Sequence, residues 1–237
     1  CGPLAQPALT RSHAAARALV WAGIVLLLPL TSLPLLVELS GATTVAPPSN
    51  VLLLLLALVW LFPYLLKKGK LPKATFSFLF FLVVVLISAA AAIFWGTPVY
   101  REQNYLNEAP QALITLVMAA TAYFVAAAWL FQDRENIKLT LKIINLGGFI
   151  LLVWTVLQAL YVLFADSNYP PAMVQIQGLL VSGSNPLFGS RVNGFAYEPS
   201  WLAHQLNMVY LPVWLAATLT GYSAHRFRLV SVSIENI

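Results

Sequence analysis

Residues 190–205, with the sequence SRVNGFAYEPSWLAHQ, bring together side chains that bind anions and accept protons. Arg191 carries a fixed positive charge on a planar fork of donors that fits phosphate oxygens. Glu198 can take a proton from a hydroxyl group or orient Arg191, and His204 is a second candidate for the proton transfer. These residue types suit a site that binds an anion beside groups that can accept a proton.

The order of residues in this stretch predicts a turn that leads into a helix. Gly194 favours a tight turn, through which Arg191 can fold back toward Glu198. Pro199 suits the first turn of a helix, and the helix dipole would favour the carboxylate of Glu198 at the N-terminus. Three- and four-residue steps then place four side chains on one helix face: Trp201, His204, Gln205 and Met208.

The rest of the chain has the composition of a membrane protein. Of its 237 residues, 60% are hydrophobic and 9% are charged, and the mean hydropathy is +0.81. A soluble domain needs about 25% charged residues to cover its surface. The single cysteine excludes an internal disulfide. We therefore expect an all-α, polytopic bundle of transmembrane helices that forms a single domain over residues 1–237.

Six apolar runs approach or exceed the length needed to cross a bilayer, which is about 20 residues. The predicted spans are 18–37, 51–66, 74–95, 112–131, 139–164 and 201–222. Prolines within the first and sixth spans are tolerated because neighbouring helices can bond the freed carbonyl groups. The chain begins with Cys1 and ends shortly after the last span, so we expect it to be truncated at its C-terminus.

The basic residues predict the orientation of these spans. With both termini in the cytoplasm, all Lys and Arg residues except Arg101 and Arg191 lie on the inner side, in agreement with the positive-inside rule. The basic residues form short clusters between spans and not one charged face, which argues against nucleic acid as a partner. The largest inner cluster sets the topology and touches anionic membrane lipids: Lys67, Lys68, Lys70 and Lys73.

The outer segment before the sixth span, residues 165–200, is long for a connection within a compact bundle. Its middle, residues 172–184, is amphipathic, which predicts a short helix lying in the membrane interface. The second outer segment, residues 96–111, contains Arg101, which we rank as a second phosphate contact below Arg191.

The run from Arg191 to Ala203, RVNGFAYEPSWLA, resembles a motif of the O-antigen ligase and O-antigen polymerase families. Their members commonly show R-x-x-G-x-x-x-[E/D]-P-[S/N]-x-x-A where a periplasmic segment leads into a transmembrane helix. The resemblance covers only these residues, and six spans would fit many families. It implies a bacterial inner-membrane protein of ten to twelve spans, with a later and larger periplasmic segment that carries a further essential Arg and, in ligases, a His.

The resemblance also implies a function. These families are glycosyltransferases that transfer or polymerise glycan from a polyprenyl-diphosphate carrier, with inversion and without a metal or other cofactor. The acceptor would be a growing glycan or the lipid A core. Glu198 and His204 would serve proton transfer, and Arg191 would neutralise the diphosphate. The residues assigned to substrate binding are Arg191, Gly194, Tyr197, Trp201 and Arg101.

Each of these residues also has a structural interpretation. Arg191 and Glu198 can form a salt bridge that fixes the loop to the sixth span. His204 can bond a neighbouring helix, and the residue type favours that role over catalysis. Tyr197 and Trp201 can belong to the aromatic belt at the membrane interface.

Other functions remain open at this stage. A transporter or flippase of lipid-linked sugars is the main alternative, although transporters place charges on broken helices near the membrane midplane and the predicted spans carry almost none. An intramembrane protease is disfavoured because the chain lacks a G-x-S-x-G element with a later helical His. The sequence does not separate a polymerase from a ligase, since the two differ in the acceptor.

Overall fold

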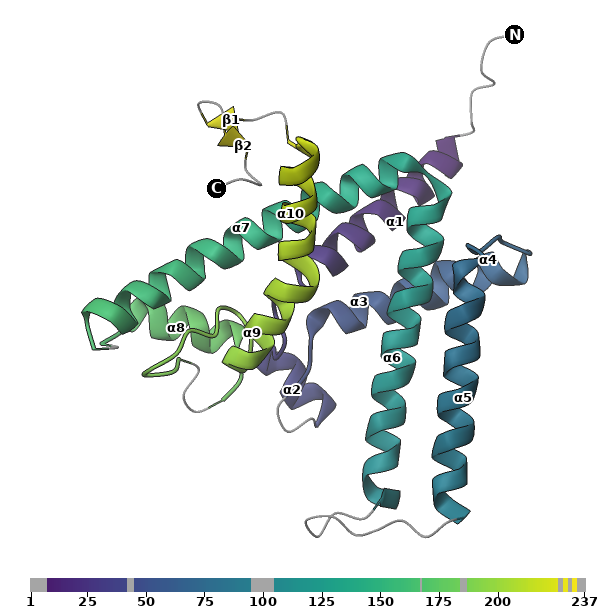
Figure 1. The fold of residues 1–237 in the computed structure, drawn as a ribbon, viewed down its shortest axis with the longest axis horizontal. Coiled ribbons are helices and arrows are strands. Elements are labelled where there is room, and N and C mark those ends of the chain that lie inside the picture. The colour runs from purple at the N-terminus through teal and green to yellow at the C-terminus, as the bar shows by residue number, and fades with distance from the viewer. Residues whose placement is uncertain are drawn as a thin grey trace. The chain divides into compact units, whose positions relative to one another are not determined.

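The computed structural model describes residues 8–41, 45–94, 105–166, 168–183, 187–225, 228–229 and 232–233. The protein is an all-α bundle, as predicted, with a two-stranded hairpin of β1 (Arg228–Leu229) and β2 (Val232–Ser233) near the C-terminus (Figure 1). The contacts divide the chain into two compact units. The first contains residues 1–52 and 135–237, and the second contains residues 53–134.

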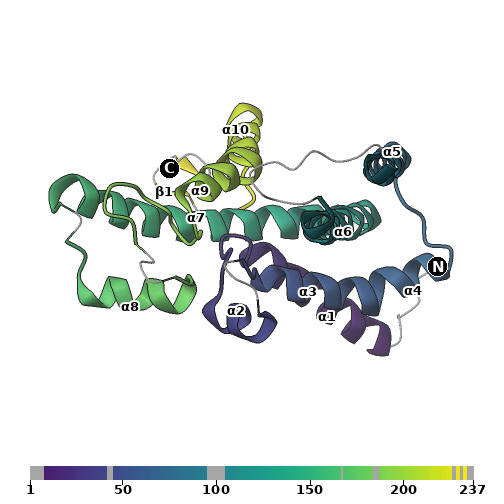
Figure 2. The ribbon, with the colours of Figure 1, turned by 90° about the horizontal axis from the view of Figure 1, so that it is seen from below.

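The first unit is built around one long helix, α7. Figure 2 shows α8 on one side of α7 and the α9–α10 segment on the other. The helices assigned to this unit are α1 (Ala8–Leu26), α2 (Pro34–Ser40), α7 (Arg134–Phe164), α8 (Pro171–Leu180), α9 (Pro199–Gln205), the π-helical turn η2 (Leu206–Tyr210) and α10 (Leu211–Thr220). The α8 helix confirms the short helix predicted in the segment before the sixth span.

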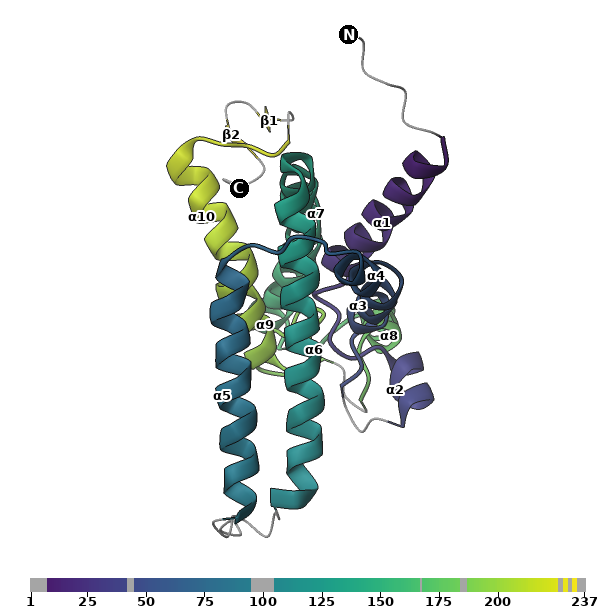
Figure 3. The same ribbon diagram turned by 90° about the vertical axis from the view of Figure 1, so that its right-hand side faces the viewer.

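The second unit contains a pair of antiparallel helices, α5 (Ala74–Phe94) and α6 (Tyr105–Gln132), which run side by side (Figures 1 and 3). Their contact is aromatic: the rings of Phe78 and Tyr123 lie 4.2 Å apart between centroids. The π-helical turn η1 (Ala57–Leu61) also packs on α6, where the rings of Trp60 and Trp129 meet edge to face at 5.8 Å. α3 (Pro48–Leu56) precedes η1, and α4 (Phe62–Leu66) follows it.

Four helices of the described chain are long and apolar enough to cross a membrane. They are Pro48–Leu66, Ala74–Ala92, Ala109–Gln132 and Arg134–Phe164, and they correspond to the second to fifth predicted spans. Large apolar side chains cover their outer surfaces; Phe76 and Phe80, for example, are 70% and 72% exposed. Such surfaces are stable only in contact with lipid or another apolar partner, so the protein is membrane-embedded.

The first predicted span is not one continuous helix. α1 ends at Leu26, and α2 begins at Pro34, so residues 27–33 form an irregular break inside the predicted span 18–37. Pro29 and Pro34 explain the break, because proline has no N–H to donate and its ring disfavours helical backbone at the preceding residue. Instead, Leu33 N–H donates to the carbonyl of Ala46, next to a bridge between Ser32 and Ala46.

The sixth predicted span is helical throughout, but its hydrogen-bond pattern changes in the middle. In η2, the backbone shifts to the wider π pattern, and Leu211 N–H donates to the carbonyl of Leu206. Pro212 follows at once and cannot donate to the preceding turn, so the wider turn accommodates its ring. The same combination occurs in the second span, where η1 precedes Pro63.

Gly148 lets the sixth span pack closely on α7. A Cβ atom on Gly148 would lie 2.4 Å from Cζ2 of Trp214 and 2.7 Å from Cδ1 of Tyr210. The indole Nε1 of Trp214 also donates to Oδ1 of Asn145, at 3.2 Å. Small residues allow such close helix crossings in membrane proteins, where van der Waals contact and hydrogen bonds replace the hydrophobic effect between helices.

We expect Gly148→Ala to destabilise the first unit by about 1 to 3 kcal/mol, because the added methyl group overpacks the crossing of α7 and α10. Unfolding in detergent micelles measures the change. Gly178→Ala is a matched control, since nothing lies within 4 Å of a Cβ at Gly178 in α8 and alanine favours the helix. Equal stability of the two variants would show that the crossing is not tightly packed.

Candidate functional site

Two buried glutamines hold the loop that precedes α9. Gln158 of α7 and Gln177 of α8 are both fully buried. Oε1 of Gln158 accepts from the backbone N–H groups of Asn193 and Gly194, at 3.2 and 2.9 Å. The side-chain amides of Gln158 and Gln177 donate to the carbonyl of Gly194, at 3.1 and 2.9 Å. The two side chains thus bond both backbone polar groups of Gly194.

The glutamines are themselves held in one orientation. Oε1 of Gln177 accepts from the indole Nε1 of Trp154 at 2.7 Å and from Nε2 of Gln158 at 3.4 Å. The ring of Trp154 also stacks on Phe195, with 5.7 Å between centroids and 14° between planes. Because every polar atom of both amides has a partner, this buried network is stabilising and specifies a single loop conformation.

Gly194 is required for two reasons. Its φ of +58° lies in the left-handed region, and a Cβ atom would lie 2.8 Å from Cδ1 of Leu151 and 3.1 Å from Cδ1 of Leu202. The predicted tight turn is therefore present. Gly194 itself is buried and supports the loop from its inner side, while its assignment to substrate binding stays a prediction.

The break in the first span holds the loop from a second direction. Oγ1 of Thr31 accepts from the backbone N–H of Tyr197 at 2.8 Å. The side-chain amide of Gln205 donates to the carbonyls of Leu28 and Pro29, at 3.1 and 3.3 Å. Carbonyl groups that the broken helix leaves without a helical partner are thus bonded by the helix that follows the loop.

Arg191 projects from this fixed loop toward the surface. Its guanidinium carbon lies 5.6 Å from the centre of the Phe188 ring, a cation–π distance, and the side chain is exposed. Phe188 is anchored in turn, because its carbonyl accepts from the hydroxyl of Tyr169 at 3.0 Å. The structural alternative, a salt bridge between Arg191 and Glu198, is not observed. Among the described side chains, the ion pair found is that of Lys138 and Glu135.

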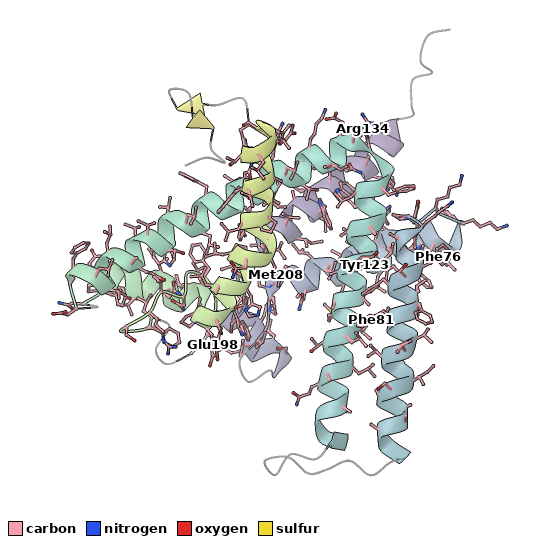
Figure 4. All side chains as sticks on the ribbon, viewed as in Figure 1. Phe76, Phe81, Tyr123, Arg134, Glu198 and Met208 are labelled. Atoms are coloured by element: carbon pink, nitrogen blue, oxygen red, sulfur yellow. The ribbon has the colours of Figure 1, made fainter. Side chains whose placement is uncertain are left out.

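Glu198 and His204 are linked through Ser200. Glu198 is exposed at the start of α9 (Figure 4), and its Oε2 accepts from the Ser200 hydroxyl at 3.2 Å. Nδ1 of His204 lies 2.9 Å from the carbonyl oxygen of Ser200. A carbonyl only accepts, so Nδ1 is the donor in this bond and Nε2 takes no part in it. Both side chains can therefore accept a proton.

Two aromatic rings lie beside these groups. The rings of Tyr197 and Trp201 are 6.1 Å apart between centroids, and both residues are half-buried. Met208, predicted on the same helix face, is 76% exposed and lies farther along the helix (Figure 4). Gln205 instead turns toward the break in the first span, so the predicted face is not a single polar surface.

An apolar hollow of about 180 Å³ opens beside the same loop. Phe195 contributes one wall, and the remaining walls come from the end of α1, the middle of α7 and the end of α8. The other lining residues are Leu26, Pro29, Leu30, Gly147, Ile150 and Leu180. The loop thus has an exposed cationic residue and also contributes to an apolar hollow.

The structure brings together some of the predicted site residues. Glu198 bonds the hydroxyl of Ser200 and His204 bonds its carbonyl, Tyr197 and Trp201 contact each other, and Arg191 contacts Phe188 instead of Glu198. Arg101 lies outside the described residues. Among those that are described, no group of three His, Cys, Asp or Glu side chains could hold a metal ion.

Sequence reasoning missed the residues that fix the loop. Neither Gln158 nor Gln177 was among the predicted site residues. The available signal was the position of each amide in an apolar run, since polar side chains there need a specific partner. Gln132, by contrast, is exposed at the end of α6.

Comparisons with protein-family models, with curated proteins and with solved structures find no match to this chain. The resemblance of residues 191–203 to the O-antigen ligase and polymerase motif therefore stays a prediction.

We expect Gln158→Leu to lower the free energy of unfolding by at least about 2 kcal/mol, because it leaves the N–H groups of Asn193 and Gly194 buried without their acceptor. The loosened loop should also be cut faster by trypsin after Arg191. Unfolding in micelles and limited proteolysis measure the two effects.

Gln132→Leu is the control for this substitution, since it removes an exposed amide and should change stability by less than about 0.5 kcal/mol. If Gln158→Leu left both the unfolding midpoint and the cleavage rate unchanged, the amide network would not be what holds the loop.

Proposed function

We propose that this protein is a membrane glycosyltransferase that moves glycan from a polyprenyl-diphosphate carrier to a hydroxyl group of an acceptor, as a polysaccharide polymerase or ligase. The observation that carries the proposal is that Arg191 is exposed and forms no salt bridge with Glu198. Its guanidinium is exposed on a loop that is fixed from below by buried hydrogen bonds, and it is not neutralised by Glu198. A guanidinium on such a fixed loop, without an ion-pair partner among the described side chains, is suited to bind phosphate oxygens in a two-point contact.

The chemistry needs a proton acceptor and a stabilised leaving group. The acceptor hydroxyl attacks the anomeric carbon of the donor sugar, and the bond from that carbon to the diphosphate oxygen breaks. The diphosphate leaves with the electron pair, and Arg191 stabilises its charge. The proton of the hydroxyl moves to Glu198. His204 is the second candidate base, through its Nε2.

Two further features support a lipid-linked substrate. The apolar hollow beside Phe195 offers a surface to the isoprenoid part of a carrier, next to the loop that carries Arg191. Tyr197 and Trp201 present adjoining rings, and such rings stack on the apolar faces of sugars. The positive-inside rule predicts that this loop lies on the non-cytoplasmic side of the membrane. In the bacterial inner membrane that the resemblance implies, this side is the periplasm, where lipid-linked glycans are assembled into surface polysaccharide.

A flippase of lipid-linked sugars is the second candidate, and the broken first span is the observation in its favour. Transporters use discontinuous helices to form substrate sites. In this chain, however, the described carbonyls of the break at Leu28 and Pro29 are bonded by Gln205, and the break contains no ionisable residue. The break therefore supports the loop and does not offer a site for a charged substrate.

We expect Arg191→Ala to lower glycan transfer at least 100-fold with a normal amount of protein in the membrane, because the leaving diphosphate loses its positive partner. Arg191→Lys should also be poor, since an ammonium group cannot replace the two-point contact. Transfer from a synthetic polyprenyl-diphosphate glycan by the full-length protein in proteoliposomes measures this. Lys142→Ala, which removes an exposed charge from α7, is the matched control.

Full transfer by the Arg191→Ala protein would overturn the proposal. A flipping assay on the same proteoliposomes separates the two candidates: flipping that survives in Arg191→Ala, without any transfer in the unmodified protein, would establish the flippase.

Glu198→Gln and His204→Gln distinguish the two proton acceptors. We expect Glu198→Gln to lower the rate of transfer about 100-fold with little change in KM, and His204→Gln to lower it less than tenfold. Single-turnover transfer rates at saturating donor measure both. The reverse order would assign the base to His204.

A further inference from the structure

The turn between α4 and α5 carries four lysines on a rigid backbone. Lys67, Lys68, Lys70 and Lys73 are all exposed, and side chains with nitrogen ends extend outward at this turn (Figure 4). No Asp or Glu occurs between residues 39 and 101, and none of these lysines is in the ion pair found among the described side chains. The turn therefore presents a concentrated positive charge without internal compensation.

Hydrogen bonds fix the backbone of this turn between Tyr64 and Lys70. α4 ends in a Schellman motif, in which Gly69 N–H donates to the carbonyl of Tyr64 at 2.9 Å and Lys68 N–H donates to that of Leu65 at 3.0 Å. The hydroxyl of Tyr64 then donates to the carbonyl of Lys70 at 2.7 Å. The lysines thus stand on a defined turn and not on a loose linker.

The left-handed position of this motif is held by Lys68, with φ of +59°. The same pair of hydrogen bonds ends α10, and there the left-handed residue is Gly221. A residue with a side chain is disfavoured in this conformation relative to glycine. A glycine is present one position later, at Gly69, but its backbone is not left-handed, and it is needed because a Cβ would lie 2.4 Å from the Tyr64 ring.

A lysine kept at a position that favours glycine points to a use for its charge. The surroundings define that use. The turn joins two helices that are each long and apolar enough to cross a membrane, so it lies at the level of the lipid headgroups whichever way the chain is oriented. Phe62, Leu66 and Phe76, at the adjoining helix ends, are 60%, 69% and 70% exposed.

We infer that the turn Lys67–Lys73 is a binding site for the headgroup of an anionic phospholipid. The lysines contact the phosphate groups, and the exposed Phe62, Leu66 and Phe76 contact the acyl chains. All four lysines lie within seven residues of one hydrogen-bonded turn, so the positive charge is concentrated there and not spread over the surface. The inference does not rest on the proposed glycan transfer, because it concerns only residues 53–134.

Lys68→Gly tests the inference because its effects on stability and on binding have opposite signs. Glycine relieves the left-handed backbone, so the midpoint of thermal unfolding should rise by roughly 2 to 4 °C. Preference for anionic lipid should fall about fivefold, the factor that corresponds to about 1 kcal/mol for one lysine near an anionic surface. The full-length protein is reconstituted in phosphatidylcholine bilayers, and electron spin resonance measures the immobilised fraction of spin-labelled phosphatidylglycerol against spin-labelled phosphatidylcholine.

Two further variants distinguish binding at the ordered turn from a general attraction of anionic lipid to exposed positive charge. Gly69→Ala keeps every lysine but displaces the turn, and it should also lower the preference for phosphatidylglycerol. Lys142→Gln removes one exposed positive charge from α7 and should leave the preference unchanged. An equal loss in Lys142→Gln and Lys68→Gly, or an unchanged preference in Lys68→Gly or in Gly69→Ala, would overturn the inference.

Discussion

The hydrogen bonds from Gln158 and Gln177 to the backbone of Gly194 are the constraint on which the candidate site depends. The backbone of Asn193 and Gly194 is buried, so water is not available to bond it, and an unbonded N–H or carbonyl there costs several kcal/mol. A loop without secondary structure is stable there only if side chains supply the bonds. Two amides from two helices do so here, and the loop conformation follows from their positions.

The break in the first span obeys the same constraint. Prolines remove helical donors between α1 and α2, and the freed groups find partners in other segments: Gln205 bonds two carbonyls, and Thr31 bonds the N–H of Tyr197. A bond between the hydroxyls of Ser32 and Ser182 joins the break to the end of α8. Irregular segments that are distant in sequence thus satisfy one another, which leaves Arg191, Glu198 and His204 exposed for a ligand.

The cationic turn of the second unit is organised differently. Its backbone is bonded locally, through a helix cap and the hydroxyl of Tyr64, and its four lysine side chains are exposed. Lys68 keeps a conformation that glycine would adopt more easily. At the loop before α9, by contrast, the left-handed position is taken by Gly194 because no side chain fits there. At these two positions, the surroundings therefore decide which residue takes the left-handed conformation: glycine where the position is buried, and lysine where it is exposed.

The sequence by itself determined the class of the protein and most of its elements. Apolar runs of sufficient length predict the membrane helices, and the pattern of residues 172–184 predicts α8, because helical periodicity and length are local properties. The partners of Gln158, the bonds that Thr31 and Gln205 make, and the separation of Arg191 from Glu198 were decided only by the tertiary structure. These contacts join residues up to 177 positions apart, and they depend on how helices cross, which no local pattern encodes.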